Sequence, residues 1–160
     1  MTTTGTPRTQ IVADPTVPLV RIVREFDAPV ARVFRAHADS ALFELWNGPR
    51  GMRMTTDRWD FRTGGAYHYV ITSDGVDDGF IGSFHEIRPD ELIVQTFCWE
   101  GMPDGVALER LAFEDLGDGR TRLTGTSLVD SFEGRDAFLA SGMETGVIEG
   151  YERLDELLAQ

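Results

Sequence analysis

The sequence predicts an α+β domain in which a curved antiparallel sheet of about seven strands wraps around a long C-terminal helix, with two short helices after the first strand. Three observations lead to this prediction. Segments rich in β-branched and aromatic residues follow one another through the middle of the chain, separated by short turns. Two short segments after residue 26 have apolar residues at helical spacing. Residues 142–158 carry one continuous apolar stripe at the same spacing.

Length and composition fit a single domain. The chain has 160 residues, of which 41% are hydrophobic, and this is enough to bury a core without disulfides or metals. Residues 1–16 are rich in Thr, contain Pro7 and Pro15, and show no apolar period. We therefore expect a flexible N-terminal tail over residues 1–16 and one domain over residues 17–160.

The chain is strongly acidic. Lys and Arg number 15 while Asp and Glu number 27, which gives a net charge of −12. Such a surface repels phosphate backbones and anionic headgroups, so we expect no nucleic-acid partner and no membrane partner. Cys98 is the single cysteine, no secretory signal is recognisable, and no segment approaches the roughly 20 apolar residues that cross a bilayer. These features predict a cytoplasmic protein, and they leave a monomer and a homodimer open.

The first strand and the two short helices lie near the start of the domain. Residues 19–26 form a β-branched run that predicts a strand. Asp27 and Pro29 then indicate a helix start, because a carboxylate can cap free amides and proline is tolerated in the first turn. Asp39 can cap a second short helix, which ends at residues 47–49 (NGP).

Six further strands follow, separated by tight turns. Residues 117–119 (GDG) are a strong hairpin signal, since glycine readily adopts a positive φ. Sequential strands joined by such short turns pair antiparallel. The expected strands cover residues 52–62, 66–73, 80–87, 92–100, 106–116 and 120–129.

The C-terminal helix is expected to pack its apolar stripe on the concave face of the sheet. A shorter helix over residues 135–141 is expected before it. Gly150 lies within the stripe, where either a bulky side chain from the sheet approaches closely or space is kept for a ligand. We predict that Gly150 borders a void. The stripe consists of Met143, Val147, Tyr151, Leu154 and Leu158.

Short motifs accompany these elements, namely APVARVF at 28–34, WNGP at 46–49, DFRTGGAY at 60–67, GSFHEIRPDEL at 82–92 and SGMETG at 141–146. Together with the order of the elements, they resemble the START-like superfamily, often called SRPBCC, whose members have a helix-grip fold. Within it the chain resembles the branch of the activator of heat-shock protein 90 ATPase homologues. The resemblance extends from about residue 19 to residue 158. It implies a cavity between the sheet and the long helix, which members use for lipids, hormones or polyketides, and it implies no shared catalytic residue.

Aromatic residues are the first candidates for a binding site. Strand alternation puts them in pairs on shared faces, and the C-terminal helix is expected to face them. They predict either an aromatic-lined pocket with tyrosine hydroxyls as its polar groups or an ordinary packed core. The candidate ligand-binding residues are Trp46, Trp59, Phe61, Tyr67, Tyr69, Phe84, Phe97, Trp99, Met143, Val147 and Tyr151.

Two carboxylates have the parity of core residues. Glu109 alternates in phase with Leu111 and Phe113, and Glu86 in phase with Phe84. A carboxyl group in an apolar cavity has a raised pKa and can act as an acid or a base, whereas one at a strand end is solvated or pairs with an arginine. Glu86 and Glu109 are therefore the candidates for proton transfer, and no residue is assigned as catalytic.

No metal site and no cofactor are expected. His37, His68 and His85 are scattered and no Cys/His cluster has the spacing of a zinc site. The acidic residues 74–79 lack the spacing of a calcium-binding EF-hand loop. No GxGxxG motif, phosphate-binding loop or GxSxG motif occurs, so nucleotide cofactors have no support.

Three functions remain open from the sequence. The first is binding of a small apolar or aromatic molecule beneath the C-terminal helix. The second is an enzyme on the same cavity, of the polyketide cyclase or hydrolase type, that uses Glu86, Glu109, Tyr67 or Tyr69 for proton transfer. The third is a chaperone-interacting module, as the resemblance to the ATPase activators implies.

Overall fold

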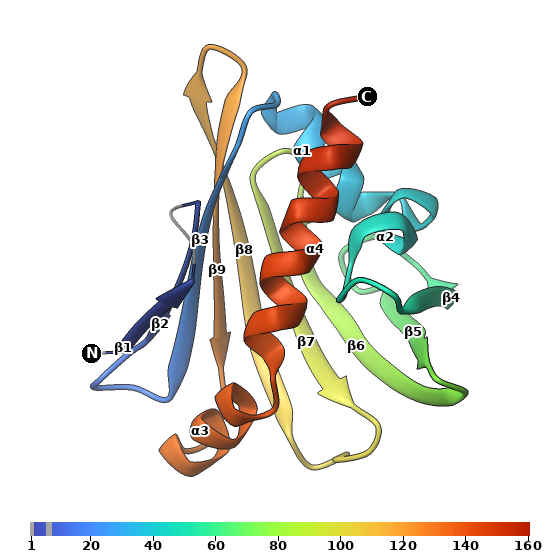
Figure 1. Ribbon diagram of the computed structural model, residues 1–160, viewed down its shortest axis with the longest axis vertical. Helices are drawn as coiled ribbons and strands as arrows, with labels where there is room; N and C mark the ends of the chain where they lie inside the picture. Colours follow the sequence, from blue (N-terminus) through green and yellow to red (C-terminus); the bar gives the residue numbers. More distant parts are fainter. Residues whose placement is uncertain (1, 6–7) are drawn as a thin grey trace.

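The computed structural model describes residues 2–5 and 8–160, and in it one antiparallel sheet curves around the helix α4 (Figure 1). The strand order within the described residues is β1-β2-β3-β9-β8-β7-β6-β5-β4. The strands are β1 (Thr2–Gly5), β2 (Thr9–Ala13), β3 (Leu19–Phe26), β4 (Arg53–Trp59), β5 (Ala66–Ser73), β6 (Val76–Arg88), β7 (Leu92–Trp99), β8 (Val106–Gly117) and β9 (Arg120–Leu128). The helices are α1 (Val30–Ala38), α2 (Ser40–Trp46), α3 (Phe132–Ala140) and α4 (Met143–Leu158).

The predicted fold class is confirmed. The seven expected strands correspond to β3–β9, and the two short helices α1 and α2 follow β3. The β8–β9 hairpin turns at Asp118, whose φ is 54°, between Gly117 and Gly119, whose φ values are 81° and 72°. This left-handed backbone is the reason for the two glycines, since a side chain with a Cβ is strained there.

The expectation of a flexible N-terminal tail is wrong for the described part of that segment. Strand β2 pairs with β3 along its whole length, and β1 pairs in turn with β2. Ile11 in β2 is 1% exposed, so this strand contributes to the core. Residues 1, 6 and 7 belong to the same expected tail and lie outside the described residues.

The helix boundaries follow from local capping. Asp39 caps α2 as predicted, because its side chain accepts a hydrogen bond from the backbone N–H of Ala41 at 3.0 Å. Pro29, and not Asp27, occupies the N-cap of α1. Helix α3 begins at Phe132, earlier than predicted, because Ser131 accepts a hydrogen bond from the N–H of Gly134 at 3.0 Å. None of the helices in the described ranges is both long and apolar enough to cross a membrane.

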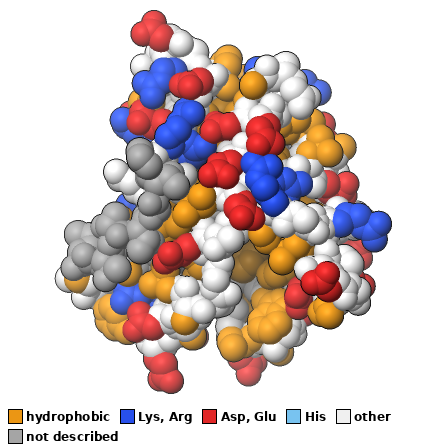
Figure 2. Space-filling view, viewed as in Figure 1, with side chains coloured by type: hydrophobic (Ala, Val, Ile, Leu, Met, Phe, Trp, Pro, Cys, Tyr) orange, Lys and Arg blue, Asp and Glu red, His pale blue; other side chains and the backbone are white. Residues whose placement is uncertain are grey.

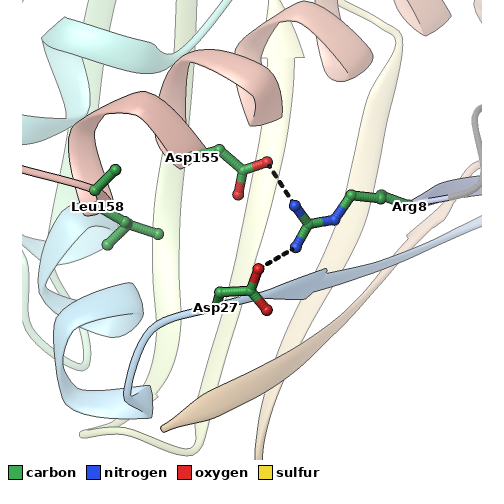
Figure 3. A pocket seen from close by; sticks show the side chains of 5 residues that line it. Arg8, Asp27, Asp155 and Leu158 are labelled. Atoms are coloured by element: carbon green, nitrogen blue, oxygen red, sulfur yellow. Dashed lines mark hydrogen bonds and ion pairs between the residues drawn. The ribbon is translucent and has the colours of Figure 1, made fainter.

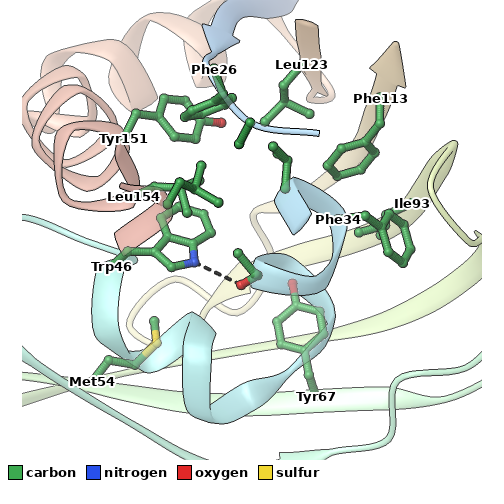
Figure 4. Packing of buried hydrophobic residues seen from close by; sticks show 14 of the residues in the cluster. Phe26, Phe34, Trp46, Met54, Tyr67, Ile93, Phe113, Leu123, Tyr151 and Leu154 are labelled. Atoms are coloured by element: carbon green, nitrogen blue, oxygen red, sulfur yellow. Dashed lines mark hydrogen bonds between the residues drawn. The ribbon is translucent and has the colours of Figure 1, made fainter. Parts of the chain in front are cut away.

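Helix α4 packs on the concave face of the sheet, as predicted. Leu154 is completely buried, Tyr151 and Leu158 are each 8% exposed, and Val147 is half-buried. The side chains that meet under this helix and under α1 and α2 form the main core (Figure 4). The sheet and α4 therefore enclose the space in which a binding site was expected.

Candidate functional site

Part of the expected aromatic pocket is a packed core. Trp46 is 4% exposed, its ring stacks on Tyr151 with centroids 5.9 Å apart, and its indole N–H donates to the carbonyl of Ala36 at 2.9 Å (Figure 4). Tyr67 is 2% exposed and its hydroxyl donates to the carbonyl of Thr96 at 2.6 Å. Around these two residues, protein side chains fill the space between the sheet and the helices.

The expected residues divide into three groups by burial. Trp46, Tyr67, Tyr69, Phe84 and Tyr151 are buried and belong to the core cluster. Trp59, Phe61, Phe97, Met143 and Val147 are half-buried. Trp99 lies directly opposite Phe80, at the end of β7, and is 42% exposed.

The second group points to a less tightly filled region beside the N-terminal half of α4. Phe80 and Phe97 stack on neighbouring strands with ring centroids 5.4 Å apart, and both rings are half-buried. Leu111 on β8 and Val147 on α4 are also half-buried, although both pack against the core cluster. Figure 2 shows a hollow with hydrophobic walls on this side of the molecule. We define the recess by five half-buried residues of the sheet and α4, namely Phe80, Phe97, Glu109, Leu111 and Val147.

A row of three polar side chains crosses the wall of the recess. Gln95, Glu109 and Ser127 lie directly opposite one another on β7, β8 and β9. The amide of Gln95 donates to one carboxylate oxygen of Glu109 at 3.0 Å, and the hydroxyl of Ser127 donates to the other at 2.7 Å. The inward parity predicted for Glu109 is confirmed, and Arg110 faces outward and is exposed.

Burial controls the protonation of this region. Desolvation raises the pKa of Glu109, and the hydrogen bonds from Ser127 and Gln95 oppose this effect. Desolvation also raises the pKa of Tyr151, with a further contribution from the negative charge of Glu109. The same two causes raise the pKa of Tyr67 and Tyr69. These phenols therefore stay protonated at neutral pH.

The parity prediction for Glu86 is wrong. A bulge between Phe84 and Glu86 shifts the register of β6 on β7, so Ile87 packs against the core in place of Glu86. The side chain of Glu86 is 40% exposed and pairs with Arg88 at 2.9 Å, which lowers the pKa of its carboxyl group. The side chain of Glu86 therefore does not line the recess.

The prediction that Gly150 borders a void is also wrong. A Cβ atom at this position would lie 3.3 Å from both the carbonyl oxygen of Trp46 and the backbone nitrogen of Gly48. Glycine is needed here because α4 approaches the backbone that follows α2 very closely. Of the two explanations for this glycine, close approach is therefore correct, although the approaching group is backbone.

Two histidines have environments that the sequence did not reveal. His68 lies between two carboxylates, with its ring nitrogens 2.5 Å from Asp57 and 2.6 Å from Glu100, and these partners raise its pKa. His37 is 4% exposed and contacts the rings of Trp46 and Phe113. Desolvation lowers the pKa of His37 to about 4. Only the order of β4, β5, β6 and β7 in the sheet brings Asp57, His68 and Glu100 together.

Two clefts lie near the C-terminal end of α4. One, of about 240 Å³, is lined by Arg8, Asp27 and Asp155 (Figure 3). Arg8 pairs with Asp27 at 3.2 Å and with Asp155 at 3.6 Å, so the charges of this cleft satisfy one another. The other, of about 280 Å³, is lined in part by Arg32 and Arg35. In the part of the chain that the structure describes, no group of three His, Cys, Asp or Glu side chains could hold a metal ion.

Comparison with known proteins gives one family match. The family model described as "Activator of Hsp90 ATPase homolog 1-like protein" matches residues 27–159. A search of the curated proteins finds no match.

Solved structures from several bacteria have the same fold. A protein from Rhodobacter sphaeroides is 27% identical, with a TM-score of 0.86 over 95% of this chain and 98% of that chain. A protein from Arthrobacter aurescens is 29% identical, with a TM-score of 0.85 over 93% and 90%. A protein from Mycobacterium smegmatis is 25% identical, with a TM-score of 0.81 over 98% and 97%.

Proposed function

The chain belongs to the family of Activator of Hsp90 ATPase homolog 1-like proteins, within the SRPBCC superfamily, and we propose that it binds a small molecule with an apolar or aromatic body in the recess. The observation that carries this proposal is the partial exposure of Phe80, Phe97, Leu111 and Val147 between the sheet and α4. Burying such apolar surface under a ligand is favourable by about 25 cal/mol per Å².

The packed half of the core supports the recess. Trp46, Tyr67 and Phe84 are buried and hold their places through ring contacts and the hydrogen bonds of the Trp46 and Tyr67 side chains. A wall fixed in this way loses little conformational entropy when a ligand binds. We propose direct ligand contacts for Phe97, Trp99, Met143, Val147 and Tyr151 from the expected set, and for Phe80 and Leu111 in addition.

Filling the recess tests the proposal. The probe is N-phenyl-1-naphthylamine, a neutral aromatic dye that fluoresces in apolar surroundings. Val147→Phe adds a ring on the wall that α4 contributes, and we expect its affinity for the dye to fall about tenfold or more. Thr145→Phe is the matched control, because Thr145 is exposed on the same helix, and it should bind like the unaltered protein.

One outcome of this experiment would contradict the proposal. If Val147→Phe folds with unchanged circular dichroism and binds the dye with unchanged affinity, the recess is not the binding site. Native mass spectrometry of gently purified protein provides an independent test, because a copurified small molecule would identify the ligand class directly.

Proton transfer on a bound ligand is a second candidate function, favoured by the raised pKa of Glu109. A carboxyl group titrating near the working pH is the most effective acid or base. Carbon-detected NMR titration tests this candidate. A pKa close to the ordinary value of about 4.3 would argue against catalysis, whereas a value above about 6 would favour it.

A further inference from the structure

The polar row in the recess is rich in unused hydrogen-bond acceptors. A carboxylate offers about four lone-pair positions. Glu109 receives one donor on each oxygen, from Gln95 and Ser127. The carboxylate of Glu109 thus has lone pairs left for further donors. The amide oxygen of Gln95 also accepts no hydrogen bond from any described residue. A molecule that enters the recess meets acceptors here, so a group with N–H or O–H donors would complement them.

The negative charge of Glu109 has no counter-ion in the recess. Glu109 forms no ion pair within residues 8–160. Its neighbour Arg110 lies on the opposite face of the sheet and is exposed. Arg24 also lies on the concave side, but its guanidinium pairs with Asp155 and lies over the ring of Phe26 at 5.0 Å. A half-buried carboxylate without a cation is costly, and a positively charged ligand group would relieve that cost.

The surroundings of Glu109 suit a cation attached to an apolar body. The half-buried rings of Phe80 and Phe97 stack on the adjoining strands, and aromatic faces attract cations. On the side of α4, the hydroxyl of Tyr151 makes no hydrogen bond to any described residue and points toward the middle of the core (Figure 4). It can accept a hydrogen bond from a ligand donor, as Tyr hydroxyls do.

We propose that the recess selects ligands that carry a protonated amine on an apolar or aromatic body, with the ammonium group placed against Glu109. This inference rests on the proposed function, because it requires the recess to be the binding site. Glu109 is the specificity-determining residue, and Gln95 and Ser127 are positioning residues that fix its carboxylate by their hydrogen bonds.

Three probes share a phenyl ring on a four-carbon chain and differ in the terminal group. They distinguish the contribution of ligand charge to the affinity from that of the apolar contacts. They are 4-phenylbutylamine, 4-phenylbutan-1-ol and 4-phenylbutanoate, measured by displacement of N-phenyl-1-naphthylamine. A hydrogen bond to a charged group is strong enough that the amine should bind about 10- to 100-fold more tightly than the alcohol. The carboxylate should bind most weakly, because its charge repels that of Glu109.

Two variants test whether Glu109 causes the preference for the amine over the alcohol. Glu109→Gln should reduce the advantage of the amine over the alcohol to within about threefold. Glu114→Gln is the matched control, since Glu114 lies on the outer face of the same strand, is exposed, and pairs with Arg122 at 3.1 Å. It removes the same charge from the protein without touching the recess, and the preference for the amine should persist.

The unaltered protein gives a test that does not depend on the folding of a variant. Saturating 4-phenylbutylamine should lower the pKa of Glu109 in an NMR titration, whereas the alcohol should not. If the dye binds but the amine binds no more tightly than the alcohol, the inference is wrong while the proposed function stands. If Glu114→Gln removes the preference as fully as Glu109→Gln, the inference is also wrong. If neither the dye nor any of the three probes binds, the proposed function itself fails.

Discussion

The backbone of Trp46 and the α-carbon of Gly150 lie so close that a Cβ on Gly150 would be 3.3 Å from the Trp46 carbonyl oxygen. This contact joins the end of α2 to the middle of α4 without any intervening side chain. Since both partners are backbone, neither can move aside by changing a rotamer. The contact therefore sets the distance between α4 and the loop after α2.

Replacement of Gly150 by leucine should destabilise the protein by about 1–3 kcal/mol or more, because the new side chain has no space and forces backbone shifts. The measurement is urea denaturation followed by tryptophan fluorescence. Gly146→Ala is the control on the same helix, since a Cβ there would meet the side chain of Pro49 at an ordinary 3.5 Å. That variant should gain up to about 1 kcal/mol from helix propensity. Equal stability of Gly150→Leu and the unaltered protein would contradict the prediction.

Replacement of Glu109 by glutamine should stabilise the unliganded protein more at pH 7 than at pH 4. The pKa of Glu109 is raised on folding, so the folded state holds the proton more tightly than the unfolded state does. Stability is then lost as the pH rises through the folded pKa, and a residue without this proton avoids the loss. Denaturation at a series of pH values gives the difference between the two proteins. A difference that stays constant with pH would show that Glu109 titrates normally.

His37 should make the protein less stable in acid. Its pKa is lowered to about 4 in the folded state, so below the ordinary pKa of 6.5 the unfolded state takes up the proton first. Stability is expected to fall from about pH 6.5 toward pH 4. Nitrogen-detected NMR of the imidazole should show the ring neutral at pH 5.5 and above. A ring that is charged at pH 5.5 would contradict its burial beside Trp46 and Phe113.

The ionisation of His68 should change the stability with pH in the opposite direction to that of His37. Asp57 and Glu100 raise its pKa above 6.5 in the folded state, so its contribution to stability is complete below pH 6.5 and is lost as the pH rises through the folded pKa. In the same NMR titration His68 should deprotonate at a higher pH than His37. Asp57→Asn should lower the pKa of His68, and an unchanged titration curve in that variant would exclude the ion pair.

Truncation of Ile11 should destabilise the domain, because strand β2 is part of the core. Ile11 is 1% exposed, and Ile→Ala substitutions at such sites cost about 2–5 kcal/mol. Gln10→Ala is the control, since Gln10 is exposed on the same strand. Thermal unfolding measures both. If the two variants unfold at the same temperature as the unaltered protein, the segment does not pack on β3 in solution.

The sequence predicted the elements well because their signals are local. The turn at Asp118 needs a left-handed backbone and is flanked by glycine, and the cap at Asp39 depends on a hydrogen bond two residues away. Strand β2 was missed because its five residues, TQIVA, are too few to show an apolar period. Its stability comes from pairing with β3, a contact that no pattern within either segment predicts.

Side-chain orientation was predicted correctly where strand alternation is uninterrupted. Glu109 faces inward because β8 has no bulge between Glu109 and Phe113, so parity holds. The same reasoning failed for Glu86, since a bulge adds one residue and reverses every side chain beyond it. The partnership of Glu109 with Gln95 and Ser127 depends on the register of three strands. No feature of any one strand fixes that register.

Helix α4 makes most of its polar contacts from Glu149 onward, and this has a kinetic consequence. Arg153 donates to the carbonyls of Leu45 at 2.6 Å and Gly48 at 3.2 Å, while Arg50 pairs with Glu156. Toward Gly142 the helix has half-buried neighbours and a left-handed cap residue with a φ of 87°. We therefore expect the first turns of α4 to open more readily than its later turns. Backbone amides near Met143 should exchange with solvent faster than those near Leu154, and the opening rate of these turns would set an upper limit on how fast a ligand enters.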